Sequence, residues 1–155
     1  PYNNDILFDG QLGSLDFRDG KWNGIFYEED EEKAKQQGRK QNSGNLIVDF
    51  DLPKNKNVSE IAVSCMESIN VGFILHPESI SLYDISSGSE KLISSISIPK
   101  SDVDEPDSKK VFKLSLKQKN IKRVRLKINS NRSLPKGHVA EGQPAWVFVD
   151  EIFLL

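Results

Sequence analysis

The sequence is poor in the residues that build metal and redox centres. It has one cysteine, Cys65, and two histidines, His76 and His138. A single thiol cannot form an intrachain disulfide, and a zinc site made of cysteine and histidine needs more ligands than these. Cys65 lies in the apolar run 61–66, which indicates a buried, unreactive thiol. The chain also lacks a Gly-x-Ser-x-Gly elbow, a P-loop, a CxxC pair and a His-Glu-x-x-His motif, so we expect no catalytic centre.

An excess of either charge is also missing. The chain has 21 basic and 23 acidic residues and a net charge of -2. Nucleic acids and anionic membranes attract a concentrated basic field, so we expect neither as a partner. No apolar run approaches the ~20 residues of a membrane-spanning helix, so we expect no membrane insertion. The chain begins at Pro1 and its only methionine is Met66, so we expect a fragment of a larger protein, with any export signal upstream.

What is present is a series of short segments with the period-two alternation of β-strands. Residues 46–52 alternate and stop at Pro53, and residues 124–128 show the same pattern. The other expected strands are 61–66, 71–75, 80–85, 92–98, 111–116 and 146–155. Glycine, proline, asparagine and serine separate them, as in all-β sandwiches and barrels. We therefore predict one all-β domain over residues 1–155, with the highly charged segment 28–37 and the segment 100–110 as surface loops.

The N-terminal segment 7–22 has the composition of a cation-binding loop. It holds three aspartates and three glycines, so it can turn sharply and present many oxygens. Calcium takes roughly six to eight oxygen ligands, including backbone carbonyls. An Asp-Gly pair is also an ordinary turn, which is the alternative interpretation.

The last expected strand contains two adjacent carboxylates, Asp150 and Glu151. Regular alternation would place Glu151 on the face of Val149 and Asp150 on the opposite face. A carboxylate among apolar residues on a strand must be paired or bound to a metal. The same alternation predicts that the two carboxylates point apart and cannot flank one scissile bond.

Several motifs of this chain resemble those of one domain family. Asp-Gly-x-x-Gly-Ser stands at 9–14, Asp-Gly-x-Trp-x-Gly at 19–24, and an aromatic strand ending in Val-Asp-Glu-Ile at 142–152. Counterparts of three further family segments follow in the right order at 48–50, 73–77 and 122–126. Together these motifs, which cover nearly the whole chain, resemble the discoidin, or coagulation-factor C-type, domain. They are most similar to the C-terminal modules of Bacteroidetes chitobiase- or β-N-acetylhexosaminidase-like proteins.

The resemblance implies an antiparallel jelly-roll β-sandwich of the galactose-binding type. In it the segment 7–22, which we call the Asp9 loop, lies beside the C-terminal strand. Calcium sites of this family combine an aspartate, a nearby carbonyl, a hydroxyl five residues on, and a glutamate of the last strand. Carried over to this chain, the ligands are Asp9, the Gln11 carbonyl, Ser14 and Glu151, with the Asp150 carbonyl in addition. We therefore expect a structural calcium ion.

A sugar-binding face is expected where loops meet at one end of the sandwich. Sugars need an apolar surface for their C–H faces and planar polar groups for their hydroxyls. The residues that offer these groups are Trp22, Asn23, Phe73, His76, Arg132 and His138. Trp22 could instead pack against the Asp9 loop, and His76 could merely cap a strand. Relatives often carry tryptophan at positions 73 and 137, where this chain has Phe73 and Gly137, so its stacking surface is smaller.

Two functions from different classes follow from these expectations. The first is a non-catalytic carbohydrate-binding module of a secreted glycoside hydrolase, located outside the cell, in the periplasm or at the cell surface, with a glycan and the other domains of its polypeptide as partners. The second is a structural domain that packs against a neighbouring catalytic domain without binding sugar. Exposed aromatic residues at the loop end would favour the first function, and a large apolar patch on a sheet face would favour the second.

Overall fold

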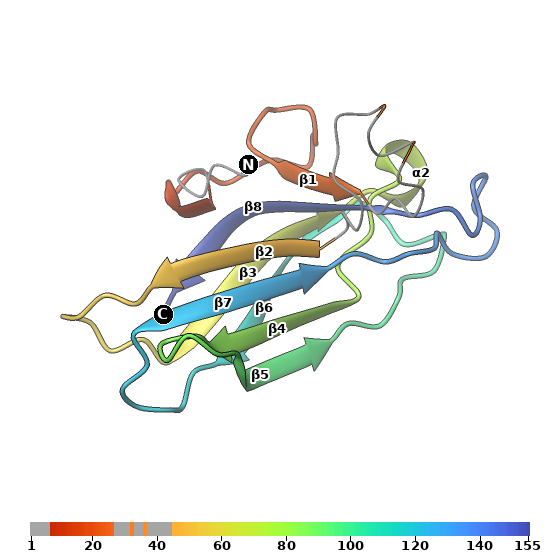
Figure 1. Ribbon diagram of the computed structural model, residues 1–155. Coiled ribbons are helices and arrows are strands. Elements are labelled where there is room, and N and C mark those ends of the chain that lie inside the picture. The colour runs from red at the N-terminus through yellow and green to blue at the C-terminus, as the bar shows by residue number, and fades with distance from the viewer. Residues whose placement is uncertain (1–6, 27–31, 33–35, 37–44) are drawn as a thin grey trace.

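The computed structural model describes residues 7–26, 32, 36 and 45–155, which form two antiparallel four-stranded sheets in a β-sandwich arrangement (Figure 1). The first sheet has the order β1-β8-β3-β6, with strands Asn23–Phe26, Trp146–Leu154, Glu60–Glu67 and Ser108–Ser115. The second has the order β2-β7-β4-β5, with strands Asn45–Asp51, Arg123–Asn129, Ser79–Asp84 and Lys91–Ser97. The all-β prediction is therefore confirmed. In the described part of the chain, no helix is long and apolar enough to cross a membrane.

The hydrophobic core consists of side chains from both sheets. Alternate residues of β2, β4 and β7 point inward, among them Val48, Leu82 and Leu126. Val63 and Cys65 of β3 join the same buried cluster. Because one face of each sheet is covered by the other, period-two patterns are visible in the sequence of most strands.

Cys65 is fully buried in this core, as the sequence predicts. Burial raises the pKa of its thiol, and the nearby negative charge of Asp150 adds to this effect. Since the thiolate is the reactive form, Cys65 should not react with Ellman's reagent in the folded protein. We expect one thiol to titrate only after unfolding in guanidinium chloride. Rapid labelling of the native protein would contradict this placement.

Three segments differ from the sequence-based expectations. The predicted strand 71–75 is replaced by one helical turn, α2 (Ile69–Gly72), followed by Phe73 in the left-handed conformation at φ 57°. Reciprocal backbone hydrogen bonds between Ser68 and Ile74 close the chain around this turn. Strand β1 was missed because a four-residue strand with a single buried residue shows no alternation. Strand β6 begins at Ser108, inside the predicted loop 100–110, whereas most of segment 28–37 lies outside the described residues.

Strand β8 contains a bulge that overturns the predicted orientation of its carboxylates. Glu151 pairs with Ser64 and Val149 pairs with Cys65, so Asp150 is an extra residue on β8. Such a bulge interrupts the alternation of side chains. Asp150 and Glu151 both contact the 7–22 segment, through Gly13 and Gly10. The prediction that the two side chains point apart was therefore wrong.

Candidate functional site

The segment 7–22 lies beside β8, as expected, and Asp150 of β8 binds it there through a hydrogen bond. Asp150 is fully buried, and its Oδ2 accepts a hydrogen bond of 2.7 Å from the Gly13 amide. The ammonium group of Lys109 lies 3.3 Å from the same oxygen and donates to the Gly13 carbonyl. Lys109 thus neutralises Asp150 from within the protein. This role of Lys109 could not be predicted from the sequence, because no motif there links residues 108–115 to residues 7–22.

Glu151 lies beside Asp9, which brings two of the predicted calcium ligands together. The Glu151 Oε2 accepts a hydrogen bond of 3.1 Å from the Gly10 amide. Burial raises the pKa of Glu151, and the negative charges of Asp9 and Asp150 raise it further. Two neighbouring carboxylates would be stabilised by a cation, so Asp9 and Glu151 fit the role of carboxylate ligands in a calcium site.

The other predicted ligands fit a calcium ion less closely. Both the amide and the hydroxyl of Ser14 donate to Asp19 Oδ2, at 2.6 and 2.9 Å. Gln11 is exposed, and its backbone N–H donates a hydrogen bond of 2.8 Å to Asp9 Oδ1. Within the described ranges, no group of three or more acidic, histidine or cysteine side chains is close enough to hold a metal. Of the predicted ligands, the described structure therefore brings together the side chains of Asp9 and Glu151.

Trp22 directly precedes β1, and Asn23 is the first residue of that strand. The Trp22 Nε1 donates to the Ser14 carbonyl at 3.1 Å, and Lys109 lies 5.3 Å from the ring centroid. A Cβ at Gly13 would stand 2.3 Å from the indole, so only glycine lets the ring pack this closely. Asn23 Nδ2 lies 3.5 Å from the Val149 carbonyl. These contacts correspond to the alternative in which Trp22 packs against the Asp9 loop.

The other predicted sugar-binding residues gather at the end of the sandwich that holds α2 and the 130–145 loop (Figure 1). Both histidines are buried there. His76 Nε2 is 3.2 Å from the Ser108 hydroxyl, and burial lowers the His76 pKa. His138 Nε2 is 2.9 Å from the Ile69 carbonyl, and its ring packs edge-on against Phe73 at 4.8 Å. Phe73 itself remains 37% exposed.

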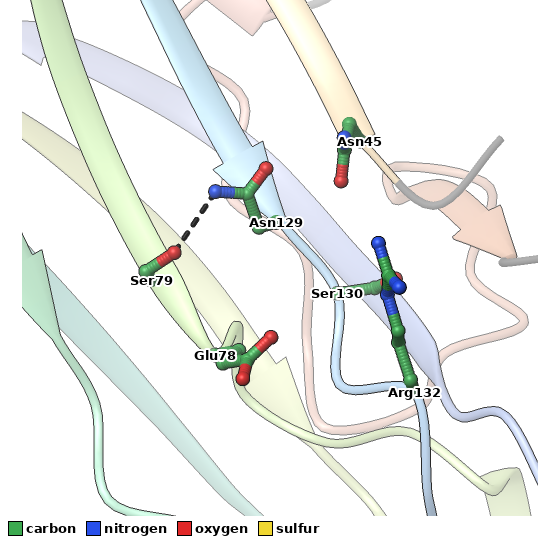
Figure 2. A pocket seen from close by; sticks show the side chains of 6 residues that line it. All are labelled: Asn45, Glu78, Ser79, Asn129, Ser130 and Arg132. Carbon is green, nitrogen blue, oxygen red and sulfur yellow. Dashed lines mark hydrogen bonds between the residues drawn. The ribbon is translucent and has the colours of Figure 1, made fainter. Parts of the chain in front are cut away.

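Arg132 reaches a polar hollow of about 400 Å³ at the same end of the second sheet (Figure 2). The hollow is lined by Asn45, Glu78, Ser79, Asn129, Ser130 and Arg132. Strand pairing places Asn45, Asn129 and Ser79 in one row across β2, β7 and β4. In Figure 2 the Arg132 guanidinium points toward Asn45, with the Glu78 carboxylate on the other side of the hollow.

Two features organise the hollow. Asn129 Nδ2 donates to the Ser79 hydroxyl at 2.9 Å, which fixes the amide plane (Figure 2). The Ser130 hydroxyl is buried and has no hydrogen-bond partner among the described residues. Because buried hydroxyls are nearly always bonded, Ser130 needs a water or a ligand group in the hollow. Of the lining residues, the sequence singled out Arg132 alone.

Comparison with protein-family models and with curated proteins finds no match to this chain.

Proposed function

We propose that this domain is a non-catalytic carbohydrate-binding module and that the polar hollow at Arg132 is its sugar site. The observation that carries the proposal is the buried Ser130 hydroxyl, which lacks a partner in the described structure at a place lined by amide, guanidinium and carboxylate groups. A pyranose presents neighbouring hydroxyls that both donate and accept hydrogen bonds. Arg132 would donate to them, Glu78 would accept from them, and the two asparagines would do both.

Our proposals on the fold type, the parent protein and the bound ion depend on the sequence motifs. The 9–14, 19–24 and 142–152 motifs resemble discoidin-type modules of chitobiase-like proteins. We accordingly propose a jelly-roll fold of the galactose-binding type, a parent glycoside hydrolase that is secreted, and a structural calcium ion at Asp9 and Glu151. The sandwich arrangement supports the proposed fold, and the position of Glu151 beside Asp9 supports the proposed ion.

Sugar binding at the hollow should be weak and should depend on Arg132 and Ser130. A shallow site for one or two sugar rings leaves little free energy after desolvation, so we expect a Kd of ~0.1–1 mM for galactose- or N-acetylhexosamine-type sugars. Hydrogen bonds to a charged group contribute about 1.5–3 kcal/mol, so Arg132→Ala should weaken binding about tenfold or more. Ser130→Ala should weaken it severalfold. NMR shift mapping with mono- and disaccharides measures both effects.

The matched control for this experiment is Arg123→Ala. Arg123 is an exposed arginine at the opposite end of β7, where it pairs with Asp51 at 2.8 Å. Its replacement should leave the sugar affinity unchanged. Loss of binding in Trp22→Ala or Phe73→Ala, with Arg132→Ala silent, would move the site to those aromatic residues and contradict the hollow.

A structural role is the second candidate function. Val71, in α2, is 66% exposed, and Val139, which follows the Phe73-contacting His138, is 85% exposed. A neighbouring domain of the same polypeptide could cover these apolar side chains. If no sugar shifts any resonance at several millimolar, this function replaces the first.

A further inference from the structure

A second hollow, which we call the basic groove, lies at the opposite end of the sandwich. It has a volume of about 690 Å³ and is formed by the loops that join β2 to β3 and β6 to β7. The lining residues all come from 52–59 and 116–121. These loops lie at the far ends of the strands from α2 and the 130–145 loop (Figure 1). The basic groove is therefore separate from the hollow at Arg132.

The basic groove concentrates positive charge in a chain whose overall charge is nearly balanced. Segments 52–59 and 116–122 together contain five lysines and no acidic residue, whereas the whole chain has a net charge of -2. The five are Lys54, Lys56, Lys117, Lys119 and Lys122, all exposed, and three of them line the groove. The preceding acidic residue, Asp51, is already paired with Arg123. None of the five lysines forms an ion pair with a described residue, so together they attract an anionic ligand.

The remaining lining residues suit a ligand that also carries hydroxyls and C–H faces. Asn57, Gln118 and Asn120 supply amide donors and acceptors. Asn120 adopts φ 67°, a turn conformation that asparagine tolerates, and this turn shapes the 116–122 loop. Val58 and Ile121 form apolar walls and pack against the main core. Lys56 is anchored by a 2.8 Å hydrogen bond from its Nζ to the Leu154 carbonyl, which fixes one side of the groove.

We infer that the basic groove binds an acidic glycan, a saccharide chain that bears carboxylate or sulfate groups. The lysines would neutralise the acidic groups, the amides would bond the hydroxyls, and the apolar walls would contact the sugar rings. Single-stranded nucleic acid is disfavoured, because no aromatic side chain lines the groove for base stacking. An anionic membrane is disfavoured, because the apolar walls are half-buried and cannot insert. This inference does not depend on the proposed sugar site at Arg132.

The test is binding of the domain to dextran sulfate and to polygalacturonate, with neutral dextran as the reference polymer. We expect binding to both acidic polymers and none to neutral dextran. The double variant Lys117→Gln/Lys119→Gln should bind the acidic polymers about tenfold more weakly at low salt. Its slope of log affinity against log salt should be shallower by about 1 to 2, because fewer counterions are released. Both lysines are exposed loop residues, so the variant should fold normally, which a thermal melt checks.

The matched control is Lys113→Gln/Lys136→Gln, which changes the net charge equally at exposed positions outside the groove. It should keep the affinity and the salt slope of the unaltered protein. Equal losses in the two double variants would overturn the inference, because binding would then reflect net charge alone. Tighter binding to a single-stranded oligonucleotide or to phosphatidylserine vesicles than to either acidic polymer would overturn it too. If NMR finds no Arg132-dependent binding of neutral sugars, the proposed sugar site fails, but the inference on the basic groove is unaffected.

Discussion

Replacing Glu151 by glutamine should abolish the stabilisation of the domain by calcium. In metal-free protein the buried Glu151 carboxyl lies beside Asp9, and burial and the negative charge of Asp9 raise its pKa, so the neutral amide should increase the melting temperature. In the unaltered protein, calcium at a hundredfold excess over its Kd should add about 2.7 kcal/mol, which corresponds to roughly 5–10 °C for a domain of this size. In Glu151→Gln that gain should be lost. Differential scanning calorimetry with EDTA and then with calcium measures both effects.

The control for this comparison is Glu105→Gln at an exposed loop position. It removes the same charge and should keep the full response to calcium. If verified metal-free protein melts at one temperature with and without calcium, the 7–22 segment is only a turn. If calcium stabilises Glu151→Gln as much as the unaltered protein, the ion binds elsewhere.

Replacing Asp150 by alanine should be among the most destabilising substitutions in the described structure. The change leaves the buried Gly13 amide without its acceptor and the Lys109 ammonium without its counterion. Because Lys109 is partly exposed and can reach water, the expected loss is about 3 kcal/mol, at the lower end for a broken buried ion pair. Urea unfolding followed by tryptophan fluorescence measures it.

Two further variants sharpen the Asp150 experiment. Asp150→Asn keeps one acceptor for the Gly13 amide and should lose less than the alanine variant. Asp104→Ala, in an exposed loop, should change the free energy of unfolding by less than about 0.5 kcal/mol. A loss that small in Asp150→Ala would mean that Asp150 does not hold the 7–22 segment against β8.

Most strands could be predicted from the sequence because each sheet buries one face. The patterns of 46–52 and 124–128 became β2 and β7 within one residue at each end. The bulge at Asp150 could not be predicted, since it depends on how β8 pairs with β3 and leaves no mark on β8 alone. The same holds for α2, whose alternating Val71 and Phe73 resemble a strand although reciprocal bonds between Ser68 and Ile74 enclose a turn.

The candidate sites were predictable only where the signal is local. Arg132 was found because it lies in a polar loop between strands, but Asn45, Asn129 and Ser79 become neighbours only through strand pairing. His76 and His138 sit on the expected loops, yet the fold buries both, because each ring packs against a phenylalanine. The lysines of the basic groove lie in two short segments of the sequence. They were not predicted as a site, because the net charge of the whole chain is nearly balanced.

The position of β8 also dictates when this domain can fold during synthesis. β8 is the last strand described, yet it lies in the interior of the first sheet, between β1 and β3. The bonds from Gly10 to Glu151 and from Gly13 to Asp150 join residues 141 and 137 positions apart. A chain emerging from the ribosome therefore exposes the inner edges of β1 and β3 until β8 appears. Such long-range closure makes folding slow and exposes unpaired edges to aggregation, so the nascent domain should depend on chaperones until β8 is released.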